Sequence, residues 1–379
     1  MKIRRPPILP LLLLPPLAGI FPLAAQNTQT APALYSEAWP ASAPRGNPFV
    51  AGRQCIADEA PTSFTPASFA PASFSEEDSL EHATMAVTAA PFSDSPPPVS
   101  RAATNTSEAR REPKPLTDLF VLVSVDGLRP DVIFPHAPTI QRLRHSGADA
   151  RNSRTISKST TLPSHASMVS GVDHDQHGLS FNSYHPERGP IRFPTIFSEA
   201  EKAGLSVRLF AGKRKLELLV TDAQKEHFQL GGVYCNRVTE LAVPYLRAAE
   251  PGIVFIHFAD PDGAGHTYGW LSEEYMHAVR RADRCVRELV DVIRSREDGI
   301  RITMLVTSDH GGHNHGHGSR RADDRNIPWL MWGEAVAPRT RIKRAVLNTD
   351  TAATVLHTLG LKAPADMQGT PVLEALLDS

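Results

Sequence analysis

Four histidines follow an aspartate in the short stretch TSDHGGHNHGHGSR, residues 307–320. The stretch comes directly after the apolar run ITMLV, which has the composition of a buried strand. Carboxylate oxygens and neutral imidazole nitrogens are ligands that zinc prefers in proteins. The stretch therefore predicts a metal site, but its spacing leaves open which side chains bind; the candidates are Asp309, His310, His313, His315 and His317.

Two more groups of acidic side chains follow apolar runs. Asp126 comes directly after LFVLVSV, and DPDGAGH, which supplies Asp260, Asp262 and His266, comes after GIVFIHFA. A single aspartate at a strand end is commonly a helix cap. The carboxyl ends of parallel strands meet at one edge of a sheet, however, and carboxylates gathered there repel each other unless a cation is present. The joint occurrence therefore favours a metal site, with zinc the best match.

A hydroxyl group precedes a predicted helix in SKSTTLPSHASMVSG. Pro163 is typical of a first helical turn, and we expect Thr161 to lie just outside the helix, beside free backbone N–H groups that bind anions. Thr161 by itself would be interpreted as an N-cap. Beside a metal, its hydroxyl can be deprotonated and act as a nucleophile.

The candidate metal ligands can lie close together only if a sheet places the ends of their strands at one edge. Apolar runs without alternation predict strands that are buried on both faces, as in a parallel sheet covered by helices. Glu273 and Glu274 in the first turn and apolar residues every three or four positions predict a long amphipathic helix over residues 272–296. The predicted fold class is α/β, a three-layer sandwich with a mostly parallel central sheet; its strands are expected at 119–125, 205–212, 252–260, 301–308 and 327–332, and further helices at 139–147 and 351–360.

The first 115 residues predict export and a spacer. Residues 1–25 have a basic head, an apolar stretch and small residues at the end, as in a secretory signal peptide. A retained membrane anchor is less favoured because prolines interrupt a run shorter than the ~20 residues of a spanning helix. Residues 26–115 are rich in Pro, Ser and Ala and predict a disordered linker before a catalytic domain at 116–379. We expect a secreted or periplasmic protein without a transmembrane helix when mature, membrane-tethered if the signal is retained.

Charge and cysteine content limit the other possibilities. The 40 basic and 41 acidic residues nearly cancel, so no nucleic-acid-binding signature is present. Three cysteines are too few for a disulfide framework. Cys235 and Cys285 are interpreted as buried apolar residues, although an exported chain could pair them; their spacing does not decide this.

As a set, the motifs resemble those of the alkaline phosphatase superfamily and, within it, the nucleotide pyrophosphatase/phosphodiesterase (type I phosphodiesterase) branch. The resemblance covers residues 116 to about 376. It is carried by VSVDGLRPD, TLPSHASMVSG, HGLSFNSY, DPDGAGHTYG, SDHGGHNHGHG, IPWLMWG and MQGTPVLEAL.

The resemblance implies a site with two zinc ions. The residues implied around one zinc are Asp126, Thr161, Asp309 and His310, and those around the other are Asp262, His266 and His317. The family motif has its threonine two residues before the proline, which selects Thr161 over Thr160. Asn182 matches a side chain that touches a phosphoryl oxygen. His313 and His315 are then expected not to be ligands.

The implied activity is hydrolysis of a small phosphodiester or nucleotide through a phospho-threonine intermediate. The charges of two Zn²⁺ ions, three aspartates and a Thr161 alkoxide sum to zero, which suits a singly charged diester. Enzymes specialised for the doubly charged monoester usually add an arginine or lysine. Asn182 is neutral and Lys158 is interpreted as a surface residue, so a diesterase is favoured over a monoesterase.

Other functions on the same scaffold stay open. A phosphonate hydrolase would use the same residues. An inactive, exported binding protein would keep the fold with or without the metals, but the presence of all seven proposed ligands argues against it. Sulfatases need cysteine or serine at the nucleophile and arginine four positions later, where this chain has Thr161 and His165. Candidates to hold a nucleotide base are the aromatic residues Phe181, Tyr184 and Tyr268.

Overall fold

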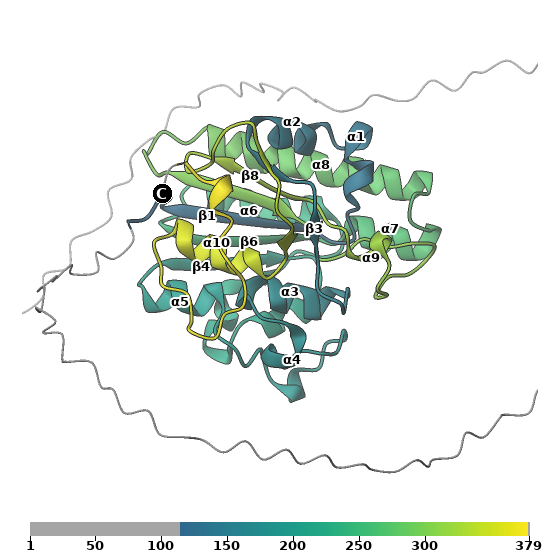
Figure 1. The fold of residues 1–379 in the computed structure, drawn as a ribbon, viewed down its shortest axis with the longest axis horizontal. Coiled ribbons are helices and arrows are strands. Elements are labelled where there is room, and N and C mark those ends of the chain that lie inside the picture. Colours follow the sequence, from purple (N-terminus) through teal and green to yellow (C-terminus); the bar gives the residue numbers. More distant parts are fainter. Residues whose placement is uncertain (1–113, 378–379) are drawn as a thin grey trace, which may run out of the picture. The chain divides into compact units, whose positions relative to one another are not determined.

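The computed structural model describes residues 114–377, which form an α/β fold around an eight-stranded sheet (Figure 1). Strand β8 pairs antiparallel with β7 and β2, and every other pairing in this sheet is parallel. Across the sheet the strands are β5 (Phe228–Leu230), β4 (Ser206–Ala211), β6 (Gly252–Phe258), β1 (Leu119–Val125), β7 (Ile302–Thr307), β8 (Trp329–Gly333), β2 (Ala148–Ala150) and β9 (Thr340–Ile342). A separate parallel pair consists of β3 (Ser153–Arg154) and β10 (Val346–Leu347).

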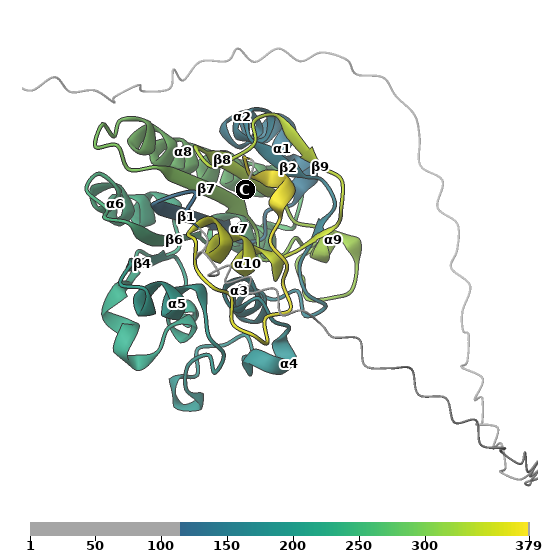
Figure 2. The same cartoon turned by 60° about the vertical axis from the view of Figure 1, so that its left-hand side comes forward.

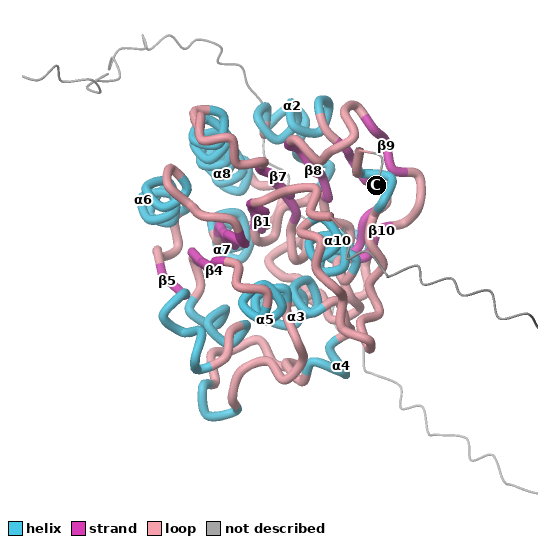
Figure 3. Tube along the Cα trace, turned by 90° about the vertical axis from the view of Figure 1, so that its left-hand side faces the viewer, coloured by secondary structure: helices cyan, strands magenta, loops and turns pink. Residues whose placement is uncertain are grey.

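Helices cover both faces of the sheet, so the predicted three-layer sandwich is confirmed. Figure 3 shows the strands between α2, α6 and α8 on one side and α3, α5 and α10 on the other, and Figure 2 gives the same grouping. The helices are α1 (Ile133–His136), α2 (Pro138–Ser146), α3 (Thr161–Ser170), α4 (His174–His177), α5 (Ile196–Lys202), α6 (Cys235–Leu246), α7 (Asp260–Tyr268), α8 (Glu273–Arg294), α9 (Ala322–Arg325) and α10 (Asp350–Thr358).

Strand β1 shows why the apolar runs lack alternation. Phe120 and Leu122 belong to the core that contains α3, α5 and α10, whereas Val121 and Val123 belong to the core that contains α2, α6 and α8. Each residue of β1 is buried, and the same holds for β6 and β7. Because both faces of these strands are covered, alternation with polar residues would place polar groups in one of the two cores.

The long amphipathic helix forms nearly as predicted. Ser272 is its N-cap, with its hydroxyl accepting a hydrogen bond from the Tyr275 backbone N–H at 3.2 Å, and Glu273 and Glu274 lie in the first turn. The buried Tyr275 hydroxyl donates to the carbonyl oxygen of Gly127 at 2.8 Å. The start of α8 is thereby tied to the loop that follows β1.

The end of one predicted strand belongs to a helix. The apolar run over 252–260 ends as a strand at Phe258, and Asp260 begins the helix α7, which the sequence analysis did not anticipate because DPDGAGH contains a proline and two glycines. The proline occupies the first turn of α7, where its missing N–H costs nothing. The interpretations of residues 1–25 and nearly all of 26–115 lie outside the described residues. Among the described helices, none has the length and apolarity needed to cross a bilayer.

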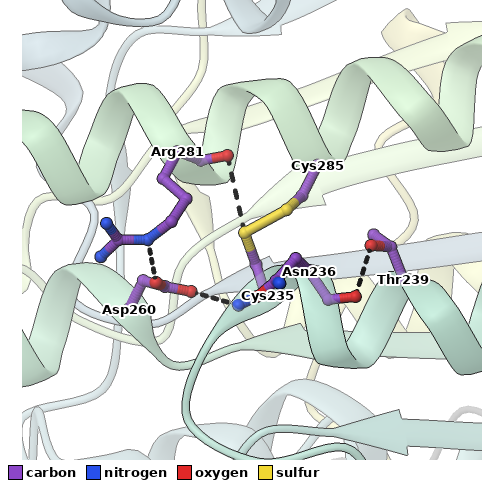
Figure 4. The surroundings of a disulfide bond; sticks show 6 residues. All are labelled: Cys235, Asn236, Thr239, Asp260, Arg281 and Cys285. Atoms are coloured by element: carbon purple, nitrogen blue, oxygen red, sulfur yellow. Dashed lines mark hydrogen bonds and ion pairs between the residues drawn. A yellow bond between two sulfur atoms is a disulfide. The ribbon is translucent and has the colours of Figure 1, made fainter. Parts of the chain in front are cut away.

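A disulfide joins α6 to α8, and the sequence analysis had left this pairing open (Figure 4). The Cα atoms of Cys235 and Cys285 lie 6.2 Å apart, and 50 residues separate them in the chain. Asp260 accepts a hydrogen bond from the Cys235 backbone N–H and forms an ion pair with Arg281. The bond and the carboxylate together hold the start of α6 against α7 and α8.

Reduction of this disulfide is expected to lower the free energy of unfolding by about 2–4 kcal/mol, since the bond closes a long loop in the unfolded chain. Urea unfolding with and without reductant measures the effect. The double variant with Cys235→Ser and Cys285→Ser should be insensitive to reductant, and Cys55→Ser should respond as the unmodified chain does. Equal midpoints for the oxidised and reduced chains would contradict the stabilising role.

Candidate metal centre

The ends of three neighbouring strands bring the acidic side chains together. Asp126 follows β1, α7 follows β6, and Asp309 follows β7, and these strands are adjacent in the order β6-β1-β7. The Asp126 N–H donates to the Phe258 carbonyl at 2.9 Å, and the Asp262 N–H donates to the Asp126 carbonyl at 3.0 Å. The Gly127 N–H donates to Asp309 Oδ1 at 3.2 Å. Backbone hydrogen bonds therefore fix the three carboxylates at one edge of the sheet.

A glycine permits the closest of these approaches. Gly127 has φ of 72°, and a Cβ atom there would lie 3.0 Å from the Asp262 Cα atom. Any other residue would strain the backbone and press against the start of α7. The loop after β1 can therefore contact α7 only because residue 127 lacks a side chain.

Asp262 and His266 lie one turn apart on α7, with 3.4 Å between Asp262 Oδ1 and His266 Nε2. Residues four apart on a helix lie on the same face. This explains the spacing of Asp262 and His266, which had been inferred only from the family resemblance. His317 Nε2 is 3.4 Å from the same Asp262 oxygen and 3.1 Å from His266 Nε2. The His310 ring stacks on that of His317, with centroids 3.6 Å apart.

The three histidines share one hydrogen-bonding pattern. In each, Nδ1 lies 2.8–2.9 Å from a backbone carbonyl oxygen; the acceptors for His266, His310 and His317 are His315, Gly311 and Ser159. A carbonyl can only accept, so Nδ1 carries the proton and Nε2 keeps a free lone pair. Metal-binding histidines are typically oriented in this way.

Three buried carboxylate oxygens in the cluster have no hydrogen-bond donor among residues 114–377: Asp126 Oδ1, Asp262 Oδ1 and Asp309 Oδ2. Buried polar atoms normally have partners, so oxygens aimed into a shared space point to a cation. Two sets of side chains offer ligand atoms within 4.8 Å of one another, namely Asp262, His266 and His317, and Asp126, Asp262 and His310. The residues present therefore fit metal ions.

Thr161 is the first residue of α3 and not, as predicted, just outside it; the N-cap is Thr160. The buried Thr161 hydroxyl lies 3.5 Å from His310 Nε2. His165, one turn later, contacts the Thr161 carbonyl through Nδ1 at 2.7 Å and the Ser124 hydroxyl through Nε2 at 2.8 Å. His165 thus links the first turn of α3 to β1. This link fixes the position of the Thr161 hydroxyl relative to the sheet.

The carboxylates differ in their electrostatic surroundings. Burial and the nearby carboxylates of Asp126 and Asp262 raise the pKa of Asp309 well above its usual range. Burial also acts to raise the pKa of Asp126, but the Lys213 ammonium and a hydrogen bond from His257 hold it well below its usual range. Negative charge is therefore concentrated in the cluster beyond what the protein's own cations neutralise.

Two lysines in this site were not predicted from the sequence. Lys213 Nζ lies 2.7 Å from Asp126 Oδ2, forms a second ion pair with Asp262, and is 3.5 Å from the Thr161 hydroxyl. Lys215 Nζ lies 3.0 Å from Asn182 Oδ1. Both lysines follow β4, the strand beside β6. A search for basic as well as acidic residues after the predicted strands would therefore have found them. The premise that the pocket lacks a lysine was wrong.

Several residues considered from the sequence lie outside the cluster. The Asp260 carboxylate contacts Arg281 and the Cys235 backbone, away from Asp262. His313 Nδ1 is 2.7 Å from Asp324, and His315 is exposed. Neither histidine is in the two sets of potential metal ligands found among residues 114–377.

A cavity of about 540 Å³ adjoins Lys213 and α7. Its walls include Tyr268, which the sequence analysis proposed, and Tyr234, which it did not. Phe181 instead lies against His185, and Tyr184 donates to Glu217; neither contributes to this wall. The cavity is large enough for the organic part of a small ester, and Lys213 is the residue that its wall shares with the metal-site cluster.

The fold and the cluster define the class of protein. A mostly parallel sheet with helices on both faces, carrying aspartates and histidines beside a threonine at the carboxyl ends of its strands, is that of the alkaline phosphatase superfamily. The model of the type I phosphodiesterase / nucleotide pyrophosphatase family matches residues 120–245 and 211–322, more than half of the chain. The chain belongs to this family.

Individual relatives are distant. Human ectonucleotide pyrophosphatase/phosphodiesterase family member 7 is 26% identical over 219 residues, which are 51% of this chain and 47% of that protein. GPI ethanolamine phosphate transferase 1 of Aspergillus fumigatus is 25% identical over 273 residues, 60% of this chain and 26% of that protein. The chain thus spans between about a quarter and a half of the length of these curated relatives.

Solved structures show the same fold. Murine ectonucleotide pyrophosphatase/phosphodiesterase 5 superposes with a TM-score of 0.60 at 16% identity, covering 68% of this chain and 100% of that one. A 2-O GAG sulfatase gives a TM-score of 0.56 at 17% identity, covering 68% of this chain and 73% of that one. These likenesses concern the arrangement of the sheet and its helices.

Asp309→Asn is expected to stabilise the chelator-treated protein by about 1 kcal/mol or more while weakening its stabilisation by metal. The amide removes one of three crowded charges, and each unit by which folding raises a pKa costs ~1.4 kcal/mol. Thermal unfolding with chelator and with added zinc measures both effects. Asp149→Asn serves as the control: it leaves the buried Arg144 without its carboxylate partner and should destabilise in both conditions. Loss of stability in chelator with an unchanged response to zinc would contradict the prediction.

Proposed function

We propose that this chain is an exported, zinc-dependent hydrolase of phosphoric esters that acts through a phospho-threonine at Thr161. The observation that carries the proposal is the position of the Thr161 hydroxyl, 3.5 Å from His310 Nε2, at the edge of a cluster with three unpartnered carboxylate oxygens. Export rests on the signal-like residues 1–25.

Two groups of residues would hold the zinc ions. Asp126, Thr161, Asp309 and His310 would surround one, and Asp262, His266 and His317 the other. The second set offers ligand atoms within 4.8 Å of one another, and so do Asp126 and His310 of the first set together with Asp262. When bound, zinc would supply positive charge that lowers the pKa of the threonine hydroxyl and stabilises a departing oxygen. His165 and Ser124 hold the first turn of α3 so that the hydroxyl faces the cluster.

The reaction consumes one water molecule. Thr161 Oγ forms a bond to phosphorus while the bond from phosphorus to the leaving oxygen breaks, and that oxygen departs with the electron pair and takes up a proton. Water then forms a bond to phosphorus, the bond to Thr161 Oγ breaks, and the threonine recovers its proton. Asn182 Oδ1 already accepts from the Leu162 N–H at 2.9 Å, so its NH₂ group is the donor available to a phosphoryl oxygen.

The family supports activity on phosphodiester or pyrophosphate bonds of small molecules. The cavity beside Lys213 would receive the leaving group, with Tyr234 and Tyr268 as apolar walls. A phosphonate hydrolase would use the same residues and would differ only in the bond that breaks. An inactive binding protein would not need a threonine hydroxyl at the cluster.

Thr161→Ala is expected to lower turnover of bis(p-nitrophenyl) phosphate by about 10³-fold or more, because the nucleophile is removed. Thr161→Ser should keep part of the activity, and a chelator should abolish it in the unmodified chain. Release of p-nitrophenol measures the rates, and mass spectrometry after acid quenching tests for a phosphoryl group on residue 161.

Thr160→Ala is the matched control. Thr160 is the neighbouring hydroxyl and caps α3 without a side-chain hydrogen bond, so its removal should change turnover by no more than a few fold. Equal rates for Thr161→Ala and the unmodified chain would disprove the threonine mechanism. Full activity in a chelator would disprove the zinc dependence.

A further inference from the structure

Two lysines project from one short segment into the site. Lys213 and Lys215 flank Arg214 after β4; Lys213 Nζ pairs with Asp126 and Asp262, and Lys215 Nζ contacts Asn182. Burial and the neighbouring Lys213 ammonium lower the pKa of Lys215, and the carboxylates of the cluster oppose this shift. Arg214 points the other way: its side chain is 60% exposed, lies over the Tyr184 ring and pairs with Glu217. The segment therefore delivers two of its three cations to the phosphoryl site.

Lys215 has donor capacity left for a ligand. Its Nζ contacts the Asn182 side-chain oxygen at 3.0 Å and the Asn182 carbonyl oxygen at 3.1 Å. An ammonium group has three N–H donors, so one stays available. It lies next to the free NH₂ group of Asn182, and the two donors together could bind two oxygens of one phosphoryl group.

Charge decides which phosphoryl group fits. With two zinc ions, the three aspartates and a Thr161 alkoxide make the site neutral, and Lys213 and Lys215 add two positive charges. A terminal phosphate in a monoester carries nearly two negative charges above its second pKa of about 6, whereas a diester carries one. The two positive charges of the lysines therefore match the two negative charges of a monoester, whereas a diester leaves one positive charge unmatched.

We infer that Lys215, with Lys213 beside it, selects a terminal, doubly charged phosphoryl group over the phosphate of a diester, so that phosphomonoesters are the preferred substrates. The inference rests on the proposed function for the reaction and assigns its substrate class. Diesters are still hydrolysed, at lower efficiency. Lys213 contacts two of the proposed metal ligands, so Lys215 is the residue that can be changed without disturbing them.

The test compares p-nitrophenyl phosphate with bis(p-nitrophenyl) phosphate, which share a leaving group, at about pH 8. In the unmodified chain kcat/KM should be higher for the monoester. Lys215→Met should lower kcat/KM for the monoester by about 10- to 100-fold, the range of a charge-assisted hydrogen bond, and change the diester by less than about threefold. Lys215→Arg should restore most of the monoester activity, and Arg214→Met should leave both substrates unchanged.

A binding measurement separates this inference from the proposed function. Calorimetry with inorganic phosphate and with dimethyl phosphate needs no turnover, and Lys215→Met should weaken phosphate binding by about tenfold or more without affecting dimethyl phosphate. That result in a chain without turnover would overturn the proposed function and, with it, the assignment of substrates, and would keep only the selectivity of Lys215 for a terminal phosphoryl group. Higher kcat/KM for the diester, or equal losses for both substrates and both ligands in Lys215→Met, would overturn the inference and leave the hydrolase proposal standing.

Discussion

Repulsion among three buried carboxylates is the constraint on which the site depends. Asp126, Asp262 and Asp309 converge where water is excluded, and each presents an oxygen that no donor within residues 114–377 satisfies. Such a cluster opposes folding unless cations compensate it. Lys213 supplies one positive charge, and the histidine nitrogens supply lone pairs and not charge. The arrangement is therefore built for metal ions at the expense of the stability of the metal-free chain.

The rest of the fold holds these groups in place. The parallel order β6-β1-β7 aligns three strand ends, and backbone hydrogen bonds join the loops that follow them. Gly127 lets the loop after β1 touch α7, and Tyr275 ties that loop to α8. The disulfide fixes α8 to α6 beside the cavity at Lys213. Rigid support of this kind keeps carboxylates together that would otherwise move apart.

The sheet and much of the cluster could be predicted from the sequence, and the reasons are physical. Strands buried on both faces leave uniform apolar runs, and polar residues after them must gather at one edge, as Asp126 and Asp309 do. Helix α7 was missed because local propensity argues against a helix in DPDGAGH, whereas its contact with the loop at Gly127 stabilises it. Lys213 and Lys215 were missed because only acidic residues and histidines were sought at the ends of the predicted strands, although both lysines follow the predicted strand over 205–212.

Lys213 and Lys215 lie near Thr161, the proposed nucleophile, and change the expected charge of the ligand, but the proposed chemistry requires metal ions at the cluster in either case. Anomalous diffraction at the zinc edge from zinc-soaked crystals tests this most directly. Two peaks are expected, one bounded by Asp126, Thr161, Asp309 and His310 and the other by Asp262, His266 and His317. The absence of zinc from this edge of the sheet, or its binding only at His313 and His315, would contradict it.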